Sequence, residues 1–312
     1  MVKVYGKRIS AILLIILTVC FLCACGNEKK TDVLSDEING TATYIYDNLM
    51  EPDLGSIGGE WAVKAIKDSG IDVEEGFFED YVERLENYVI NKKGVLDDRR
   101  LTEYARVSIA LASLGLDATD FAGYDLITPM DNYEKLTIQG VNAAAFALVA
   151  SNLYDVKLEC EDQLIDYIIN SMKSGDYGYA GYDAGPDYQA MALEGLSFYT
   201  GMDKVDSYIE DTIKELQKMQ KDDGSFGNCE STSEVICALS QLGIDVTTDK
   251  RFSKDGKTPL DGLLEYKIKD GGFTHTLEEP ETNSMASEKA LMALNSIKLC
   301  KQGEKLYSNE AN

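Results

Sequence analysis

The sequence predicts an all-α protein of about twelve helices in six repeats, closed into a double ring, an (α/α)6 barrel. The main observation is a short apolar pattern, a small residue followed by an aliphatic one, that recurs at steps of 45, 37, 45, 46 and 55 residues. Its six copies are Ala65-Ile66, Ala110-Leu111, Ala147-Leu148, Ala192-Leu193, Ala238-Leu239 and Ala293-Leu294. A period of this length is typical of stacked or closed helical repeats.

The second observation is an amphipathic stretch near most copies, which predicts a partner helix for each. A first helix is expected around residues 32–49, and later partners are expected at 77–90, 161–172, 205–220 and 260–266. The interval of 37 residues is the exception, so its partner within residues 119–135 is expected to be short or irregular. Six pairs of helices favour a closed double ring over an open arc.

Three copies of the pattern end in the same way. Gly70, Gly115 and Gly243 each follow the helix and precede an aliphatic residue and an aspartate. Glycine adopts the left-handed conformation that ends a helix, and the aspartate opens the next turn. The sequence therefore predicts that these three helices stop at equivalent places.

The N-terminal residues indicate export and membrane attachment. Basic residues precede an apolar run from Ile9 to Leu22, which is typical of a secretory signal. The motif Leu22-Cys23-Ala24-Cys25 resembles a bacterial lipobox, in which Cys25 carries the lipid. The protein is then expected on the extracellular face of the cell membrane, as in Gram-positive bacteria. The alternatives are a plain transmembrane anchor and an ordinarily cleaved signal.

These features divide the chain into four parts. Residues 1–25 are assigned to a lipoprotein signal peptide and 26–40 to a flexible polar tether. Residues 41–300 are assigned to a single domain, because no linker divides them, and 301–312 to a polar C-terminal tail.

Composition narrows the classes of partner and chemistry. A formal net charge of −24 argues against nucleic acid as a partner. The four cysteines after Cys25 permit disulfides in an exported chain, but partly buried free thiols are preferred; they are Cys160, Cys229, Cys237 and Cys300. Only one histidine, His275, is present, so neither a zinc site nor a Ser-His-Asp triad is expected.

The turns before the repeat helices are rich in glycine, acidic residues and aromatic residues. Asp187, Ser231 and Asn283 are expected to cap the helices that follow. Phe226 and Phe273 are expected to fill gaps between helix pairs. A functional role is preferred for the cluster of Tyr177, Tyr179 and Tyr182.

Six phrases, in order, carry a resemblance to a known family. They begin at Gly58, Thr102, Gln139, Asp187, Glu230 and Asn283. Together with Asp-Gly-x-Phe turns, they resemble the prenyltransferase and squalene-cyclase repeat, whose fold is the α/α toroid. The chain is most similar to bacterial surface lipoproteins whose toroid resembles the α-domain of transcobalamin and intrinsic factor. The resemblance implies cobalamin, or another corrinoid, as a possible ligand and no other cofactor.

The chain departs from that family in three respects. Gln189 stands where the family has threonine, and Glu234 stands where relatives have glutamine. The small β-domain that covers the ring in many relatives has no counterpart after the last repeat. The resemblance therefore implies an open ring that binds a corrinoid alone or together with a partner.

The apolar repeat helices are expected to form the inner ring, with their N-terminal ends meeting at one mouth. The predicted function is non-catalytic, membrane-anchored binding of an extracellular small molecule or cell-surface protein at that mouth. The expected ligand-binding residues are Trp61, Tyr104, Arg106, Gln139, Asn142, Tyr179, Tyr182, Asp187, Glu234, Asn283 and Glu288. Met191, Leu193 and Met285 are expected in the core, and no metal site is expected.

Two other functions stay open, and one residue needs a partner in either case. A glycan-active α/α-barrel lyase or hydrolase would use paired carboxylates at the mouth. A surface protein-interaction scaffold would expose an apolar patch away from the mouth. Arg106, within an apolar helix, requires a carboxylate, which Glu60 or Glu103 would supply.

Overall fold

The computed structural model describes residues 28–49, 51–175 and 185–308, and this part of the chain is all-helical. It contains twelve α-helices and five short 3-10 or π segments, and no β-strand. The α-helices are α2 (Glu28–Leu49), α3 (Trp61–Ser69), α4 (Phe77–Asn91), α5 (Thr102–Ser113), α6 (Tyr133–Gln139), α7 (Val141–Leu153), α8 (Glu161–Ser174), α9 (Pro186–Leu196), α10 (Asp203–Met219), α11 (Cys229–Gln241), α12 (Pro259–Leu264) and α13 (Ser284–Gln302).

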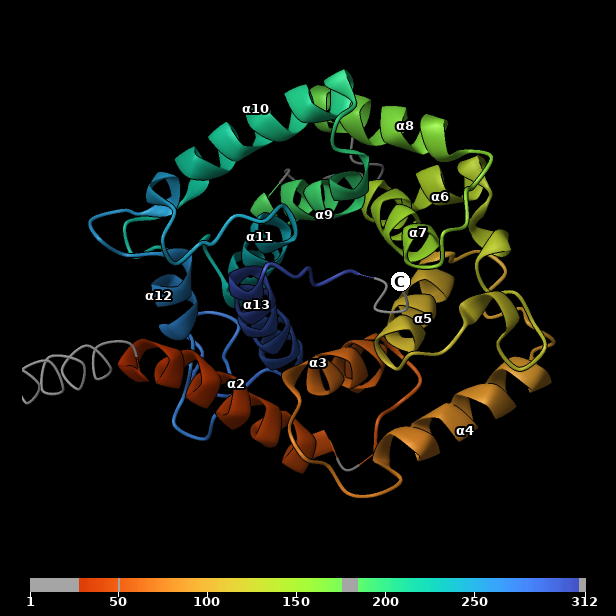
Figure 1. The fold of residues 1–312 in the computed structure, drawn as a ribbon, viewed down its shortest axis with the longest axis horizontal. Coiled ribbons are helices and arrows are strands. Elements are labelled where there is room, and N and C mark those ends of the chain that lie inside the picture. Colours follow the sequence, from red (N-terminus) through yellow and green to blue (C-terminus); the bar gives the residue numbers. More distant parts are fainter. Residues whose placement is uncertain (1–27, 50, 176–184, 309–312) are drawn as a thin grey trace, which may run out of the picture.

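Six of these helices surround the centre of the molecule (Figure 1). We call α3, α5, α7, α9, α11 and α13 the inner helices. Each packs against the next in chain order, and α13 packs against α3. Each inner helix contains one copy of the small-aliphatic pattern, and every residue of the six copies is at most 1% exposed. The prediction that these segments are buried helices is confirmed.

The other six helices lie outside them, as Figure 1 shows for α2, α4, α8, α10 and α12. Five of them match the predicted partner stretches to within a few residues, and α6 is the exception. The α4 helix shows why they are amphipathic: Tyr81, Leu85 and Val89 are buried, whereas its charged residues face outward. Residues 119–135 hold only two 3-10 turns and the start of α6, so this stretch is irregular as predicted, but α6 lies mostly after it.

Helix ends largely follow the sequence signals. Gly70, Gly115 and Gly243 have φ angles of 76°, 73° and 77°, the left-handed region that ends a helix. Asn283 caps α13 by accepting a hydrogen bond from the amide of Ala286. The prediction of Ser231 as a cap is wrong, because Asn228 takes that position and Ser231 donates its amide to it.

The remaining predictions for the turns have mixed outcomes. Asp187 lies in the first turn of α9 and makes no side-chain cap, so that prediction is also wrong. Phe226 and Phe273 are buried as expected. Residues 1–25 with the lipidation site Cys25, and the three tyrosines Tyr177, Tyr179 and Tyr182, lie outside the described residues.

The predicted tether differs from the structure. Helix α2 begins at Glu28, inside the segment 26–40, and Ile38 is only 2% exposed. Glu37 forms an ion pair with Lys267. The apolar side chain and the ion pair hold this part of α2 against the domain, so residues 33–40 belong to it.

The predicted polar C-terminal tail is also corrected. Leu306 and Tyr307 are 4% and 1% exposed. The side-chain amide of Gln241 holds the backbone of Tyr307 at both its N–H (3.0 Å) and its carbonyl (3.1 Å). In Figure 1 the segment after α13 crosses the space between the inner helices. A Leu-Tyr pair within a polar sequence is enough to bury the segment at the C-terminal ends of the inner helices.

The four cysteines Cys160, Cys229, Cys237 and Cys300 are free thiols, as predicted. Burial raises the pKa of Cys160 to about 12, which disfavours the thiolate. Within the described ranges, none of the helices has the length and apolar character needed to cross a membrane.

Candidate ligand-binding site

A cavity of about 370 Å³ lies among the N-terminal ends of the inner helices. It is lined by Ser56, Trp61, Thr102, Arg106, Asn142, Phe146, Asp187, Met191, Glu230, Glu234, Met285 and Lys289. All of these residues except Ser56 and Trp61 form five pairs spaced i and i+4, one in the first two turns of each of α5, α7, α9, α11 and α13. The pairs are Thr102 and Arg106, Asn142 and Phe146, Asp187 and Met191, Glu230 and Glu234, and Met285 and Lys289. Residues four apart lie on one face of a helix, one turn above the other. The same face of each helix therefore points into one cavity.

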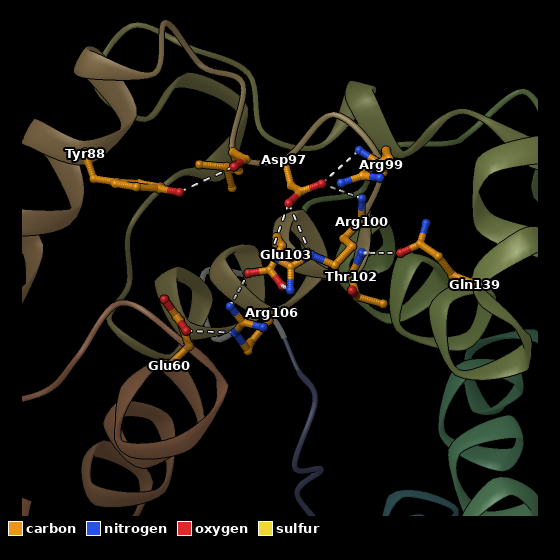
Figure 2. A network of polar contacts seen from close by, with 10 residues as sticks. Glu60, Tyr88, Asp97, Arg99, Arg100, Thr102, Glu103, Arg106 and Gln139 are labelled. Carbon is orange, nitrogen blue, oxygen red and sulfur yellow. Dashed lines mark hydrogen bonds and ion pairs between the residues drawn. The ribbon is translucent and has the colours of Figure 1, made fainter.

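Arg106 is held on one side of the cavity by two carboxylates (Figure 2). Its Nε lies 2.7 Å from Oε2 of Glu60, and its Nη2 lies 2.5 Å from Oε2 of Glu103. The prediction that these residues supply its partner is confirmed. Burial opposes the charge of the guanidinium, but the hydrogen bond to Glu103 and the charge of Glu60 raise its pKa. Glu103 also pairs with Arg100, at 3.5 Å, so the two carboxylates share two cations.

Arginine and acidic side chains continue this network at the surface. Asp97 accepts hydrogen bonds from the backbone amides of Arg99 and Arg100, both at 2.8 Å, as Figure 2 shows. These bonds lower the pKa of Asp97 to about 2. The loop before α5, and with it Thr102 and Arg106, is fixed by these contacts.

A second charged group lies on the opposite side, between α11 and α13. Nζ of Lys289 donates a hydrogen bond to Oε1 of Glu234 and lies 4.9 Å from the centre of the Trp61 ring. The Trp61 ring also packs on Phe146, with ring centres 5.5 Å apart. The other oxygen of Glu234, Oε2, is buried without a hydrogen-bond partner. The cavity thus combines an aromatic wall with a buried ion pair.

A further carboxylate lies deeper between the helices. Glu194 is fully buried, and neither of its oxygens has a hydrogen-bond partner. Burial, and the nearby charge of Glu234, raise its pKa well above the usual value. Glu194 does not line the cavity, so it would not contact a ligand bound in the cavity. It would act on such a ligand only through its charge.

Four of the predicted site residues support the cavity from outside. The hydroxyl of Tyr104 donates to the carbonyl of Gly94 at 3.3 Å and accepts from the amide of Leu96 at 3.0 Å. Gln139 accepts from the amide of Thr102 at 3.4 Å (Figure 2). Asn283 is the cap of α13.

The fourth, Glu288, accepts a hydrogen bond from the amide of Gly58 at 2.8 Å. Burial raises its pKa to about 7. This contact holds the loop that carries Ser56, one of the residues that line the cavity.

Five predicted residues do line the cavity: Trp61, Arg106, Asn142, Asp187 and Glu234. Sequence reasoning missed the other seven, namely Ser56, Thr102, Phe146, Met191, Glu230, Met285 and Lys289. The i, i+4 spacing from each helix start was the signal that would have found most of them. Leu193 is buried as expected, but Met285 was wrongly assigned to the core, since it is 41% exposed at the cavity.

The only histidine stands beside this site. Nδ1 of His275 lies 2.7 Å from Oε2 of Glu230, which lines the cavity. Among the described residues, no group of three or more histidine, cysteine or acidic side chains is placed to hold a metal ion.

No protein-family model matches the chain, and no curated protein sequence matches it.

Proposed function

We propose that this protein is a non-catalytic extracellular binding protein that takes its ligand into the cavity at the N-terminal ends of the inner helices. The observation that carries the proposal is the convergence of five i, i+4 pairs and Trp61 on one cavity. Sites for organic ligands are concave and mostly apolar, with a few placed polar groups. Trp61, Phe146, Met191 and Met285 supply the apolar wall, and the lining also contains one amide, three carboxylates and two cations.

The proposed fold is an α/α toroid of six repeats, of the transcobalamin-like surface class. The packing of each inner helix on the next, with α13 on α3, supports a closed inner ring. The six outer helices, one for each inner helix, support the pairing. In this arrangement the cavity is the open mouth, and the segment around Tyr307 covers the other end.

The proposed ligand within this class is a corrinoid such as cobalamin. A cavity of about 370 Å³ is too small to enclose such a molecule, so one edge of the macrocycle would enter it. The amide-bearing edge of a corrinoid suits Asn142 and the hydroxyl groups of Ser56 and Thr102. The flat ring would then rest on the aromatic wall.

We propose further that Cys25 is lipidated and holds the protein on the outer face of the cell membrane. The support is the lipobox-like motif and the apolar run before it. Labelling of growing cells with a radioactive or alkyne-tagged fatty acid would test it, with a Cys25→Ser variant as the control. Incorporation that survives this substitution would contradict the proposal.

A glycan-active enzyme is the alternative, and the partners of the carboxylates favour binding instead. Glu234 is bonded to Lys289, and Glu230 to His275. A glycosidase needs one carboxyl group that donates a proton and one that is a base or nucleophile. Glu194, whose raised pKa would suit an acid, does not line the cavity.

Thermal-shift and calorimetric titration against cobalamin, cobinamide and a set of oligosaccharides would test the proposal. We expect a corrinoid to raise the melting temperature and Trp61→Ala to abolish that response with the fold retained. Saturable oligosaccharide binding followed by cleavage would favour the enzyme. An intact protein that responds to no corrinoid would exclude the corrinoid proposal.

A further inference from the structure

A second cavity, of about 180 Å³, lies at the other end of the inner helices. Its walls come from α3, from the C-terminal halves of α5, α7 and α13, and from the segment that follows α13. It shares no lining residue with the cavity at the N-terminal ends. The charged residues in its lining are three lysines and one aspartate, namely Lys64, Lys67, Lys305 and Asp68. We call it the lysine cavity.

The charge of this lining is opposite to that of the chain. Acidic residues outnumber basic ones by 54 to 30 in the whole sequence, whereas three lysines and one aspartate give the lining a formal charge of +2. The carboxylate of Asp68 lies 2.8 Å from Nζ of Lys64, so its charge is compensated within the wall. A cavity with this balance in an acidic protein attracts an anion.

Lys64 is a fixed part of the wall. It is only 4% exposed, and its Nζ donates hydrogen bonds to the carboxylate of Asp68 and to the carbonyl of Leu306, the latter at 3.1 Å. The same Nζ lies 5.4 Å from the centre of the Tyr307 ring. These contacts join α3 to the segment that follows α13, so Lys64 holds two walls of the cavity together.

The other two lysines are exposed and can reach a ligand. The side chain of Lys305 forms no hydrogen bond or ion pair with the part of the chain that the structure describes, and that of Lys67 lies over the ring of Phe78, 5.2 Å from its centre. A helix dipole favours a cation in the last turn, which accounts for Lys67 in α3. It does not account for Lys64, in the middle of α3, or for Lys305, beyond the end of α13.

Apolar side chains form most of the remaining wall. Ile109, Leu153 and Leu306 are each at most 4% exposed, and Ala112 and Leu299 are half-buried. A cavity of about 150 Å³ lined by such side chains accepts benzene. The lysine cavity is therefore large enough for a phenyl or branched alkyl group, with exposed amines beside it.

We propose that the lysine cavity binds a small organic anion, a carboxylate that carries one phenyl or branched alkyl group. The apolar group would pack against Leu153 and Leu306, and the carboxylate would pair with Lys67 and Lys305. Inorganic phosphate would use the amines but leave the apolar wall without contacts. The site is separate from the cavity at the N-terminal ends, so the proposal does not rest on the proposed function.

Calorimetric titration of the purified full chain with phenylacetate and isovalerate tests this proposal. Low ionic strength is used, because salt screens the charges of exposed lysines. We expect saturable binding of both carboxylates. Phenylacetamide has nearly the same shape without the charge and should bind about tenfold more weakly or worse. Inorganic phosphate should also bind more weakly than phenylacetate, since it gains nothing from the apolar wall.

Matched variants separate this site from general effects of charge. Lys67→Gln combined with Lys305→Gln should weaken phenylacetate binding about tenfold. Lys214→Gln combined with Lys218→Gln removes the same charge from exposed positions on the outer helix α10 and should not change it. Ala112→Met should also weaken binding, because it fills part of the cavity without a change in charge.

Three results would overturn the proposal. They are no saturable carboxylate binding by the folded chain, an affinity for phenylacetamide or phosphate that equals that for phenylacetate, and undiminished binding to the lysine double variant or to Ala112→Met. If phenylacetate binds as expected while no corrinoid binds, this proposal stands and the proposed ligand of the other cavity fails.

Discussion

Glu288 provides a direct test of how the burial of a carboxyl group makes the stability of this fold depend on pH. Its side chain is 3% exposed and accepts the amide of Gly58 at 2.8 Å. Burial raises its pKa from 4.5 to about 7. The substitution Glu288→Gln keeps an acceptor for Gly58 but cannot ionise. It therefore removes the titration while preserving the shape of the site.

The sign of the effect follows from where protons are bound. Between about pH 4.5 and about pH 7 the unfolded chain loses this proton and the folded chain keeps it, so the free energy of unfolding falls as pH rises. A shift from 4.5 to about 7, at 1.36 kcal/mol per pKa unit, corresponds to about 3 kcal/mol once the pH exceeds about 7. Glu288→Gln should then be more stable than the parent by about 3 kcal/mol near pH 8 and nearly equal near pH 4.

Urea unfolding followed by circular dichroism at several pH values measures this difference. Other buried carboxyl groups titrate in both proteins and affect both equally. The measurement that reports on Glu288 is therefore how the difference in free energy of unfolding between variant and parent changes with pH. Glu86→Gln, at an exposed position on α4, is the matched control and should show no such change. A stability difference between Glu288→Gln and the parent that is constant from acid to alkaline pH would refute the reasoning.

Three further predictions concern other buried groups. Tyr307→Ala should lower the free energy of unfolding by about 3 kcal/mol, because a large side chain only 1% exposed is removed; urea unfolding measures it, and an unchanged midpoint would mean that the C-terminal segment is not docked. Arg106→Met should cost about 3 to 5 kcal/mol by leaving the buried Glu60 without its cation, whereas Glu103 keeps its pair with Arg100. Adding Glu60→Gln should recover part of the loss, and no recovery would argue against the ion pair. Burial raises the pKa of Glu194, so stability falls as pH rises above the usual carboxyl pKa, and Glu194→Gln should reduce that fall in pH-dependent unfolding, whereas an unchanged slope would show that Glu194 does not contribute.

The helices and their burial were predictable because they depend on apolar content and spacing. The small-aliphatic pattern marks helices that pack closely on both neighbours, and the glycines after three of them mark their ends. The C-terminal docking was not predictable in the same way. Leu306 and Tyr307 are two apolar residues in a polar segment, and nothing local shows that Gln241 is placed to hold them.

The sequence was enough to predict that the site lies at the first turns of the inner helices. It was not enough to predict which side chains of those turns line the cavity. Inner helices are buried on several sides, so an apolar stripe does not fix which face points to the centre. Glu288 and Lys289 illustrate this: adjacent residues on α13 project about 100° apart, so one bonds the loop at Gly58 while the other enters the cavity. The first helical turns were the right place to look, and Tyr104 beside Arg106 shows the same ambiguity on α5.

The charged groups between the inner helices argue for a ligand in their own right. Replacing a buried ion pair by apolar side chains of similar size is often neutral or stabilising, so stability alone gives little reason to keep one. Here two cations, Arg106 and Lys289, and four carboxylates lie where aliphatic residues could pack. The carboxylates are Glu60, Glu103, Glu194 and Glu234, and one oxygen of Glu234 has no hydrogen-bond partner. A bound cationic group would reduce the negative charge of this cluster. The same residues that weaken the empty protein would therefore strengthen its complex.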